Sequence, residues 1–234
     1  MHFGSDEQRR RFLLDGYAGR TRWCLGVTEP EGACRFNHSQ ALSLTPPHDA
    51  AGSDVAALRT TATLSSDGKY YIVSVFWGPV STPLSRPQVS GSKKWITGGL
   101  WADYMTAAVR TGSPTSGASG LSFLVIPLNS PGVKRRRIRV SGLHASGSTF
   151  FELNDVKVPV ENLIGKAGDG FRMIMANFNP ERFNLSIMCI RMARNAVEEA
   201  WKHALTRKTF GKPLMSHQII RAKFGSVGFL LSRD

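Results

Sequence analysis

The spacing of apolar and polar residues divides the chain into a short helical start, a long stretch with strand character and a helical end. At the start, residues 5–8 read Ser-Asp-Glu-Gln, a capping-box pattern that predicts a helix over residues 9–14. Gly16 or Gly19 would end this helix. We therefore expect residues 1–21 to form a helical region of their own.

From residue 23 onward, short runs rich in β-branched and aromatic residues alternate with turn residues, as is typical of strands. Asp67-Gly68 lies between two such runs and predicts a hairpin. Because strands do not alternate with helices, the pattern favours an antiparallel barrel or sandwich over a parallel sheet. Eight runs are predicted as strands: residues 23–28, 58–65, 69–73, 89–97, 104–110, 121–126, 133–140 and 149–153.

Two segments interrupt this strand pattern. Residues 33–49 carry a cysteine, two histidines and a proline pair, and residues 74–89 carry three prolines. Proline cannot donate to a strand ladder, so neither segment suits a central strand. We expect both to be insertions that lie outside the core of the β region.

Helical spacing returns after Pro159, which predicts a domain boundary near residue 160. Pro180 has the fixed φ and the missing N–H that suit a first helical position, so a long helix is predicted to start at residues 177–180. Its apolar residues cover more than one face, as in a helical bundle. A last helix is predicted to begin near Pro213. The predicted division of the chain is 1–21, 22–160 with insertions near 33–50 and 74–89, and 161–234.

Composition adds limits to this picture. Of the 234 residues, 41% are hydrophobic, and no apolar run approaches the roughly 20 residues that span a bilayer. Cys24, Cys34 and Cys189 are too few and too scattered for a disulfide framework. We therefore expect an intracellular protein, with mitochondrial, peroxisomal and cytoplasmic locations all open. Cys34 lies near His38 and His48 without a fourth ligand, so we expect no metal site.

The formal charge of +13, from 30 basic and 17 acidic residues, favours polyanionic partners such as nucleic acid, anionic membranes or phosphorylated small molecules. The densest basic run is residues 134–139, Lys-Arg-Arg-Arg-Ile-Arg. It has no interleaved aromatic residues and no nucleic-acid-binding signature. We therefore expect a solvated strand edge and no nucleic-acid partner.

Ordered motifs run along the chain once the two interrupting segments are skipped. They are Leu-Gly-Val-Thr-Glu-Pro at 25–30, Ala-Gly-Ser-Asp-Val at 51–55, Asp-Gly at 67–68, Ser-Gly-Ser-Lys-Lys-Trp-Ile-Thr-Gly-Gly at 90–99 and Arg-x-Thr-Phe-Gly-Lys at 207–212. In this order and at these intervals they resemble the acyl-CoA dehydrogenase family. The resemblance implies an α+β fold with an antiparallel β-barrel middle domain. The tail of a helical domain would precede it, and the long helices of an incomplete four-helix bundle would follow.

The resemblance also implies FAD-dependent desaturation of an acyl-CoA thioester between Cα and Cβ. Such chemistry needs a carboxylate base for the α-proton, hydrogen-bond donors on the thioester oxygen and an electron sink for the β-hydride. The substrate-binding residues that it implies are Ser53, Asn179 and Arg182. The cofactor-binding residues are Leu25, Val27, Thr28, Gly52, Ser53, Trp95, Ile96, Thr97, Arg207, Thr209, Phe210 and Gln218. Taken without the resemblance, Trp95 suits the barrel core equally well.

Glu181 is the candidate catalytic base. Some members of the family place a glutamate immediately before the arginine of this helix start, as in Glu181-Arg182, whereas most carry the base in the last part of the bundle. On the residues alone, Glu181 suits the helix dipole as a first-turn carboxylate, and Arg182 would pair with a neighbour. Both interpretations of Glu181 are open at this point.

The resemblance therefore implies an acyl-CoA dehydrogenase that acts on acyl-CoA, passes electrons to an electron-transfer flavoprotein and assembles as a homo-oligomer. Three other functions fit parts of the pattern: an acyl-CoA oxidase that returns electrons to oxygen, a basic binding module without catalysis, and an inactive interaction fragment. Residues 33–49 separate Thr28 from Gly52 and Ser53. For this reason we expect the chain to bind FAD weakly or not at all.

Overall fold

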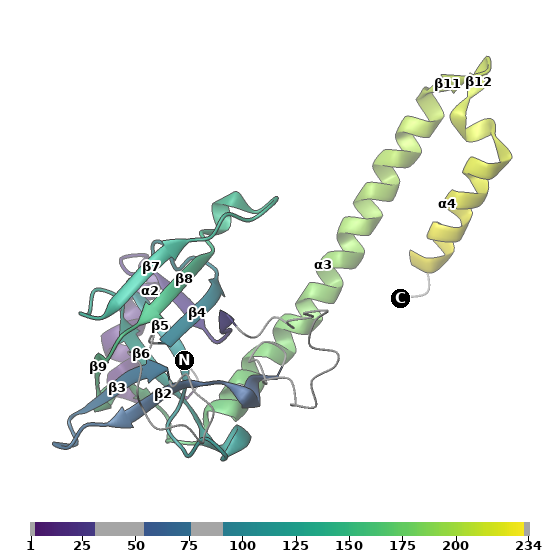
Figure 1. The fold of residues 1–234 in the computed structure, drawn as a ribbon. Coiled ribbons are helices and arrows are strands. Elements are labelled where there is room, and N and C mark those ends of the chain that lie inside the picture. Colours follow the sequence, from purple (N-terminus) through teal and green to yellow (C-terminus); the bar gives the residue numbers. More distant parts are fainter. Residues whose placement is uncertain (1–2, 31–53, 76–90, 232–234) are drawn as a thin grey trace, which may run out of the picture. The chain divides into compact units, whose positions relative to one another are not determined.

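A computed structural model describes residues 3–30, 54–75 and 91–231 of the chain. The chain divides into two compact units, Met1–Ile174 and Met175–Asp234 (Figure 1). The boundary falls inside the long helix α3 (Gly170–Thr206). The first unit therefore contains the helical start and all strands but the last two, and the second contains most of α3, those two short strands and the helix α4 (Gln218–Leu231).

The first helix has three consecutive parts: α1 (Asp6–Gln8), the π-helical η1 (Arg9–Leu13) and α2 (Leu14–Tyr17). The predicted capping box is confirmed, because the side chains of Ser5 and Gln8 each accept from the other's backbone N–H at 3.1 Å. Gln8 also donates from Nε2 to the carbonyls of Glu161 and Leu163, both at 2.7 Å. The residue that caps the helix thus also ties it to the β region.

The β region of the first unit contains two sheets. Its strands are β1 (Trp23–Gly26), β2 (Thr60–Leu64), β3 (Tyr70–Val75), β4 (Gly91–Ile96), β5 (Tyr104–Arg110), β6 (Leu121–Pro127), β7 (Val133–Arg137), β8 (Thr149–Leu153), β9 (Val156–Pro159) and β10 (Leu163–Ile164). Short 3-10 helices join them: η3 (Val55–Ala57), η4 (Gly117–Gly120), η5 (His144–Ser146) and η6 (Val160–Asn162).

One sheet has seven strands in the order β10-β6-β5-β2-β3-β9, with β1 also beside β5, and the other has the order β4-β8-β7. Most neighbours are antiparallel, but β1 and β2 both pair with β5 in parallel, which the sequence pattern did not predict. One core is shared by the sheets: Ile96 and Phe151 of the smaller sheet cluster with Val73 and Met105 of the larger one. The α+β class predicted from the sequence is confirmed.

The structure corrects the predicted start of the second insertion. Ser74 and Val75 belong to β3, where they pair with Thr61 and Thr60 of β2. The predicted interruption therefore starts two residues too early. The rest of that segment, and all of the segment predicted near 33–50, lie outside the described residues.

The long helix begins earlier than predicted. α3 starts at Gly170, and Pro180 lies inside it rather than at its first turn. Met173 and Ile174, 5% and 1% exposed, are buried in the first unit. Gly170 allows the helix to start close to the strands, because a Cβ there would lie 2.6 Å from the backbone of Leu121. The predicted helix start at residues 177–180 is therefore wrong, since packing of the preceding residues extends the helix backwards.

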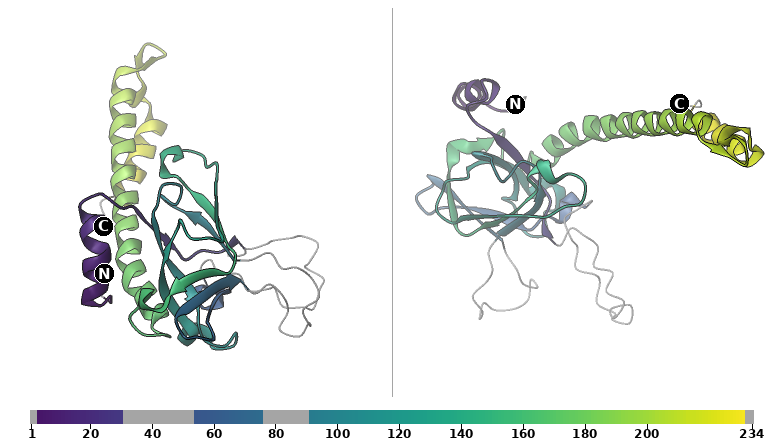
Figure 2. Two further views of the ribbon diagram at one scale, coloured as in Figure 1. Left: turned by 90° about the vertical axis from the view of Figure 1, so that its left-hand side faces the viewer. Right: turned by 90° about the horizontal axis from the view of Figure 1, so that it is seen from above.

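The second unit is a helical hairpin. Between α3 and α4 lie β11 (Lys208–Thr209), β12 (Lys212–Pro213) and the 3-10 helix η7 (Leu214–Ser216), so α4 begins five residues after the predicted start at Pro213. α4 returns beside α3, as Figure 2 shows. Trp201 and Phe224 meet edge to face at 5.2 Å, and Arg194 donates to the Leu231 carbonyl at 3.0 Å. None of the helices in the described ranges combines the length and the apolar character needed to cross a bilayer.

Candidate functional site

The end of β1 meets β4 in the first unit. The backbone N–H of Lys94 donates to the Thr28 carbonyl at 2.9 Å, and Lys93 Nζ donates to the Val27 carbonyl at 3.1 Å. These bonds join two stretches that are more than 60 residues apart in the sequence. The two stretches hold six of the predicted cofactor residues: Leu25, Val27, Thr28, Trp95, Ile96 and Thr97.

Close packing of β1 on β5 supports this meeting point. A Cβ on Gly26 would overlap with the Sδ atom of Met105, which is fully buried. A larger residue at position 26 would therefore require the Met105 side chain to move for β1 to pair with β5 in this register. Val27, 5% exposed, anchors the next position in the interior, whereas Leu25 and Thr28 are half-buried.

Trp95 is directed outwards by an irregularity in β4. The register shifts between Lys93 and Ile96, and Trp95 has φ of 65°, in the left-handed region that non-glycine residues rarely adopt. Its side chain is 48% exposed, and Lys94 Nζ lies 4.7 Å from its ring centroid. The alternative that Trp95 fills the core is therefore wrong; Ile96 does so instead. Strained backbone of this kind clusters at functional sites.

Glu29 and Lys93 form a buried ion pair directly behind this meeting point, with Nζ and Oε1 3.0 Å apart. Lys93 is fully buried and also donates to the Ala108 carbonyl at 2.8 Å. The Glu29 carboxylate accepts from the backbone N–H groups of Arg59 and Thr60, both at 2.9 Å, and from the Thr60 hydroxyl. We call Glu29, Lys93 and the groups they bind the Glu29–Lys93 network.

The charges of this pair depend on each other. Burial by itself would raise the pKa of Glu29, but the Lys93 ammonium and the hydrogen bonds from Thr60 and Arg59 hold that pKa below its usual value. Burial lowers the pKa of Lys93, and the Glu29 carboxylate opposes that shift. Removal of either partner would therefore leave an uncompensated charge in the interior.

Arg110 of β5 binds the residues that follow the segment 31–53. Its guanidinium donates to the carbonyls of Ala56 (2.5 Å), Leu58 (3.0 Å) and Gly117 (2.9 Å). These bonds fix η3 and the start of β2 in the first unit. Gly52 and Ser53, which the family resemblance assigns to the cofactor and substrate, lie just outside the described residues.

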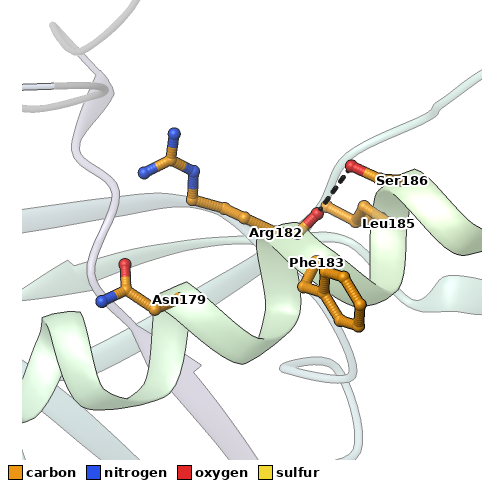
Figure 3. Close-up of a pocket in the computed structure, with 5 residues that line it drawn as sticks. All are labelled: Asn179, Arg182, Phe183, Leu185 and Ser186. Atoms are coloured by element: carbon orange, nitrogen blue, oxygen red, sulfur yellow. Dashed lines mark hydrogen bonds between the residues drawn. The ribbon is translucent and has the colours of Figure 1, made fainter.

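Asn179 and Arg182 lie on one surface of α3 in the second unit. They line an open depression of about 450 Å³ together with Phe183, Leu185 and Ser186 (Figure 3). Asn179 and Arg182 extend from the same side of the helix in Figure 3, as residues three positions apart do. Ser186 Oγ donates to the Arg182 carbonyl at 3.2 Å. Two of the predicted substrate-binding residues are thus neighbours.

Glu181 occupies a different face of α3. It is exposed, and its Oε1 accepts a hydrogen bond from Asn177 Nδ2 at 2.9 Å. Since α3 begins at Gly170, Glu181 is well beyond the first turn, where the helix dipole acts. The interpretation of Glu181 as a first-turn dipole partner is therefore wrong.

The other predicted cofactor residues gather at the turn between α3 and α4. Arg207 follows α3, Thr209 lies in β11 and Gln218 begins α4. Thr209 Oγ1 and His217 Nε2 are 2.9 Å apart, which closes the turn. Phe210 has φ of 49° and is 94% exposed. The tip of the hairpin therefore presents a cation and an exposed aromatic ring.

The sequence-based reasoning missed Glu29 and Lys93, although both stand inside motifs that it singled out. Lys93 occupies an inward position of a strand whose burial alternates, as Gly91 does before it. A lysine at an inward position must have a buried partner, because an isolated buried ammonium is too costly. That signal was present in the sequence, but the identity of the partner was not.

The two sites differ in the chemistry that they can perform. The meeting point of β1 and β4 offers an exposed indole and threonine hydroxyls, which suit a planar organic ring. The surface of α3 offers an amide and a guanidinium, which suit phosphate or carbonyl oxygens. Within the ranges that the structure describes, no group of three or more His, Cys, Asp or Glu residues could hold a metal ion.

Comparison with known proteins defines the class to which this fold and these sites belong. Residues 41–156 match the middle-domain model of acyl-CoA dehydrogenases, and residues 168–229 match the C-terminal-domain model. The chain belongs to the acyl-CoA dehydrogenase family, as its motifs predicted. It is 45% identical over 97% of its length to acyl-CoA dehydrogenase apdG of Emericella nidulans, and 39% identical over 99% to acyl-CoA dehydrogenase AFT10-1 of Alternaria alternata.

Solved structures agree with this assignment. The chain aligns over 99% of its length with a probable acyl-CoA dehydrogenase of Mycobacterium abscessus, at 36% identity and a TM-score of 0.78, covering 51% of that chain. It is 26% identical to a glutaryl-CoA dehydrogenase in complex with glutaryl-CoA, with a TM-score of 0.76 and 49% coverage of that chain. It is also 26% identical to a glutaryl-CoA dehydrogenase of Mycobacterium smegmatis in complex with FADH2, with a TM-score of 0.74 and 49% coverage of that chain. The chain spans 44% and 45% of the two curated relatives, about half their length.

Proposed function

We propose that this chain carries flavin and acyl-CoA contacts of an FAD-dependent acyl-CoA dehydrogenase. The observation that carries the proposal is the meeting of the end of β1 with the irregular strand β4, joined by the bond from Lys94 N–H to the Thr28 carbonyl. This contact gathers six predicted cofactor residues from two distant stretches at one edge of the first unit.

The residues at this edge fit a flavin. A planar ring would stack on the exposed indole of Trp95, and the hydroxyls of Thr28 and Thr97 would hydrogen-bond to its polar atoms. Gly52 and Ser53 would approach the phosphates. FAD, when bound, would supply the electron sink for the hydride that leaves the substrate Cβ. The FADH2 complex of the Mycobacterium smegmatis relative supports this choice of cofactor.

We assign the substrate to the surface of α3. Arg182 would bind phosphate or thioester oxygen, Asn179 would donate from its amide, and Ser53 would contact the CoA arm. Glu181 would remove the α-proton, with its carboxylate oriented by Asn177. The relative solved with glutaryl-CoA supports an acyl-CoA substrate.

We further propose that the active protein is a homo-oligomer. The tip of the hairpin, with Arg207, Thr209, Phe210 and Gln218, would reach the FAD of a second copy. α3 and α4 also expose apolar side chains that a partner would cover: Phe183, Leu185, Ile187, Met188, Met192, Leu205, Ile219 and Leu230.

The electron acceptor would be an electron-transfer flavoprotein. Oxygen consumption with release of hydrogen peroxide during turnover would instead identify an oxidase, and this measurement separates the two activities directly.

Titration with FAD tests the proposed cofactor site. Flavin fluorescence would be followed as the chain is added at high concentration, with Trp95→Ala as the variant and Trp101→Ala as the control. Trp101 is 44% exposed, close to the value for Trp95, and carries no predicted cofactor contact. We expect weak but saturable binding that Trp95→Ala abolishes and Trp101→Ala retains. Equal binding by both variants would overturn the proposed site.

A further inference from the structure

The stretch that ends at Pro30 (the departing stretch) and the stretch that begins at Asp54 (the returning stretch) flank residues 31–53, and Glu29 bridges the two. The Glu29 carboxylate, at the end of the departing stretch, accepts from the N–H groups of Arg59 and Thr60 on the returning stretch. The side chain is 6% exposed. The two ends of the connection of residues 31–53 are therefore joined by hydrogen bonds that do not involve that connection.

Lys93 extends the same link to the neighbouring strands. Its ammonium has three protons and three close acceptors: the Val27 carbonyl, Glu29 Oε1 and the Ala108 carbonyl. These acceptors belong to the end of β1, to the residues after it and to β5. One fully buried cation of β4 thus fixes the position of this strand relative to the residues at the end of β1.

A second buried cation, Arg110, binds the returning stretch. Arg110 holds Ala56 and Leu58 from β5, and its guanidinium interacts electrostatically with Glu29. The point of return is thus held from one side by Arg110 and from the other by Glu29. The hydrogen bonds at the end of β1 are its strand pairing with β5, the bond from Lys94 to the Thr28 carbonyl and the bond from Lys93 to the Val27 carbonyl.

We propose that Glu29 and Lys93 are positioning residues that hold the end of β1 against β4, and so keep in place the predicted cofactor residues at this meeting point, the cofactor edge. This inference rests on the proposed function for the identity of the cofactor, but its geometric content is independent of it. Neither side chain faces the cofactor edge, since Lys93 is fully buried and Glu29 nearly so. Lys93 acts through the Val27 carbonyl, and Glu29 acts through Lys93.

Two single variants and their combination distinguish a role in positioning the end of β1 from a general contribution to thermal stability. Glu29→Gln keeps the shape and removes the negative charge, Lys93→Met removes the cation, and the double variant leaves no unpaired buried charge. Lys157→Met is the matched control, because Lys157 is an exposed lysine in β9. All four would be compared with the parent chain by thermal unfolding and by amide hydrogen exchange.

We expect exchange of the Lys94 amide, which donates to the Thr28 carbonyl, to accelerate by about tenfold or more in both single variants, the change expected when a bond to a charged group is lost. Exchange within β5 and β6 should stay slow. The double variant should recover much of the thermal stability and yet keep fast exchange at the Lys94 amide. Lys157→Met should change neither the thermal stability nor the amide exchange. If stability and exchange recover together in the double variant, or if neither single variant changes the exchange, the positioning role is overturned.

FAD titration of the same proteins distinguishes a failure of this inference from a failure of the proposed cofactor site. If the parent chain binds FAD, we expect the double variant to bind it at least about tenfold more weakly, in step with the exchange of the Lys94 amide. Unchanged FAD binding in the double variant would overturn the inference. Absence of FAD binding by the parent chain would count against the proposed cofactor site, and the exchange experiment would still decide the roles of Glu29 and Lys93.

Discussion

Pro180 stands four residues after Ala176 inside α3, so the Ala176 carbonyl receives no helical hydrogen bond from position 180. Proline in a helix interior costs about 3 kcal/mol relative to alanine. The helix nevertheless continues on both sides, because Met173 and Ile174 are buried on the preceding turn. α3 therefore contains a local weak point near the surface formed by Asn179 and Arg182.

Pro180→Ala should stabilise the helical hairpin. Alanine restores the N–H donor for the Ala176 carbonyl, while the more flexible unfolded chain offsets part of the gain, so we expect the free energy of unfolding to rise by about 1–3 kcal/mol. Urea unfolding followed by circular dichroism at 222 nm would measure the change. Arg191→Ala, an exposed substitution on the same helix, is the control and should stay within about 0.5 kcal/mol of the parent. A loss of stability in Pro180→Ala would contradict this account of α3.

Glu181→Gln should abolish reduction of bound flavin by acyl-CoA while preserving the binding of both. The amide keeps the shape and the contact with Asn177 but has no basicity, and removal of a general base costs about 10²–10⁴-fold in rate. The experiment uses a fusion in which the remaining helices of the Emericella nidulans relative complete the bundle. Anaerobic stopped-flow absorbance would record flavin bleaching.

Glu198→Gln is the matched control for Glu181→Gln, because Glu198 is another exposed glutamate of α3. It should reduce the flavin at the parent rate. If Glu181→Gln also reduces the flavin at the parent rate, the catalytic base is not Glu181 and must lie in the added part of the fusion.

Deletion of residues 33–49 should tighten FAD binding. The connection between Thr28 and Ser53 would shorten from 24 residues to seven, and the entropy of loop closure then predicts a gain of about sixfold in affinity. Fluorescence titration would measure it, and a glycine-serine replacement of equal length is the control. Tighter binding by that replacement would show that the residues of the segment, rather than its length, oppose the cofactor.

The stability of the first unit should fall at acidic pH through Glu29. Its pKa is lowered in the folded state from the usual value of 4.5, so between the two values the unfolded chain binds more protons. The stabilisation is present above about pH 4.5 and is lost as the pH falls through the folded value. Lys93 and Arg110 are the cationic groups that interact with this carboxylate.

Glu29→Gln should flatten this pH dependence and lower the free energy of unfolding at neutral pH by about 3–5 kcal/mol, because the Lys93 ammonium loses its partner. Urea midpoints between about pH 3 and pH 6 would test both effects. Glu161→Gln, at an exposed ion pair with Arg11, is the control. An unchanged slope in Glu29→Gln would show that other carboxylates cause the acid sensitivity.

Local patterns predicted the strands better than the helices. Residues 104–110 and 149–153 match β5 and β8 at both ends, because runs rich in β-branched, aromatic and other apolar residues are bounded by polar and turn residues there. The start of α3 was missed because Pro180 reports only a local preference, which the packing of Met173 overrides. The strands β9 and β10 were missed because four and two residues are too few to carry a periodic signal.

The sequence predicted which residues belong to the candidate sites, but not their conformations or their contacts. Trp95 was named, yet its left-handed backbone depends on an irregular register with β8 that no local pattern reveals. The pairing of Glu29 with Lys93 spans 64 residues and likewise depends on the tertiary fold. Asn179 and Arg182 were easier, because helical spacing alone puts them on one surface.

β7 ends the smaller sheet, and among the described strands none pairs with its outer edge. Its residues 134–137 are lysine followed by three arginines, and all four are exposed, as the sequence predicted for a solvated edge. A bare strand edge is a template on which other chains can stack into fibrils. The charge at this edge therefore keeps crowded copies of the protein apart, so that the same residues that suggest a nucleic-acid binder protect the chain from self-templated aggregation.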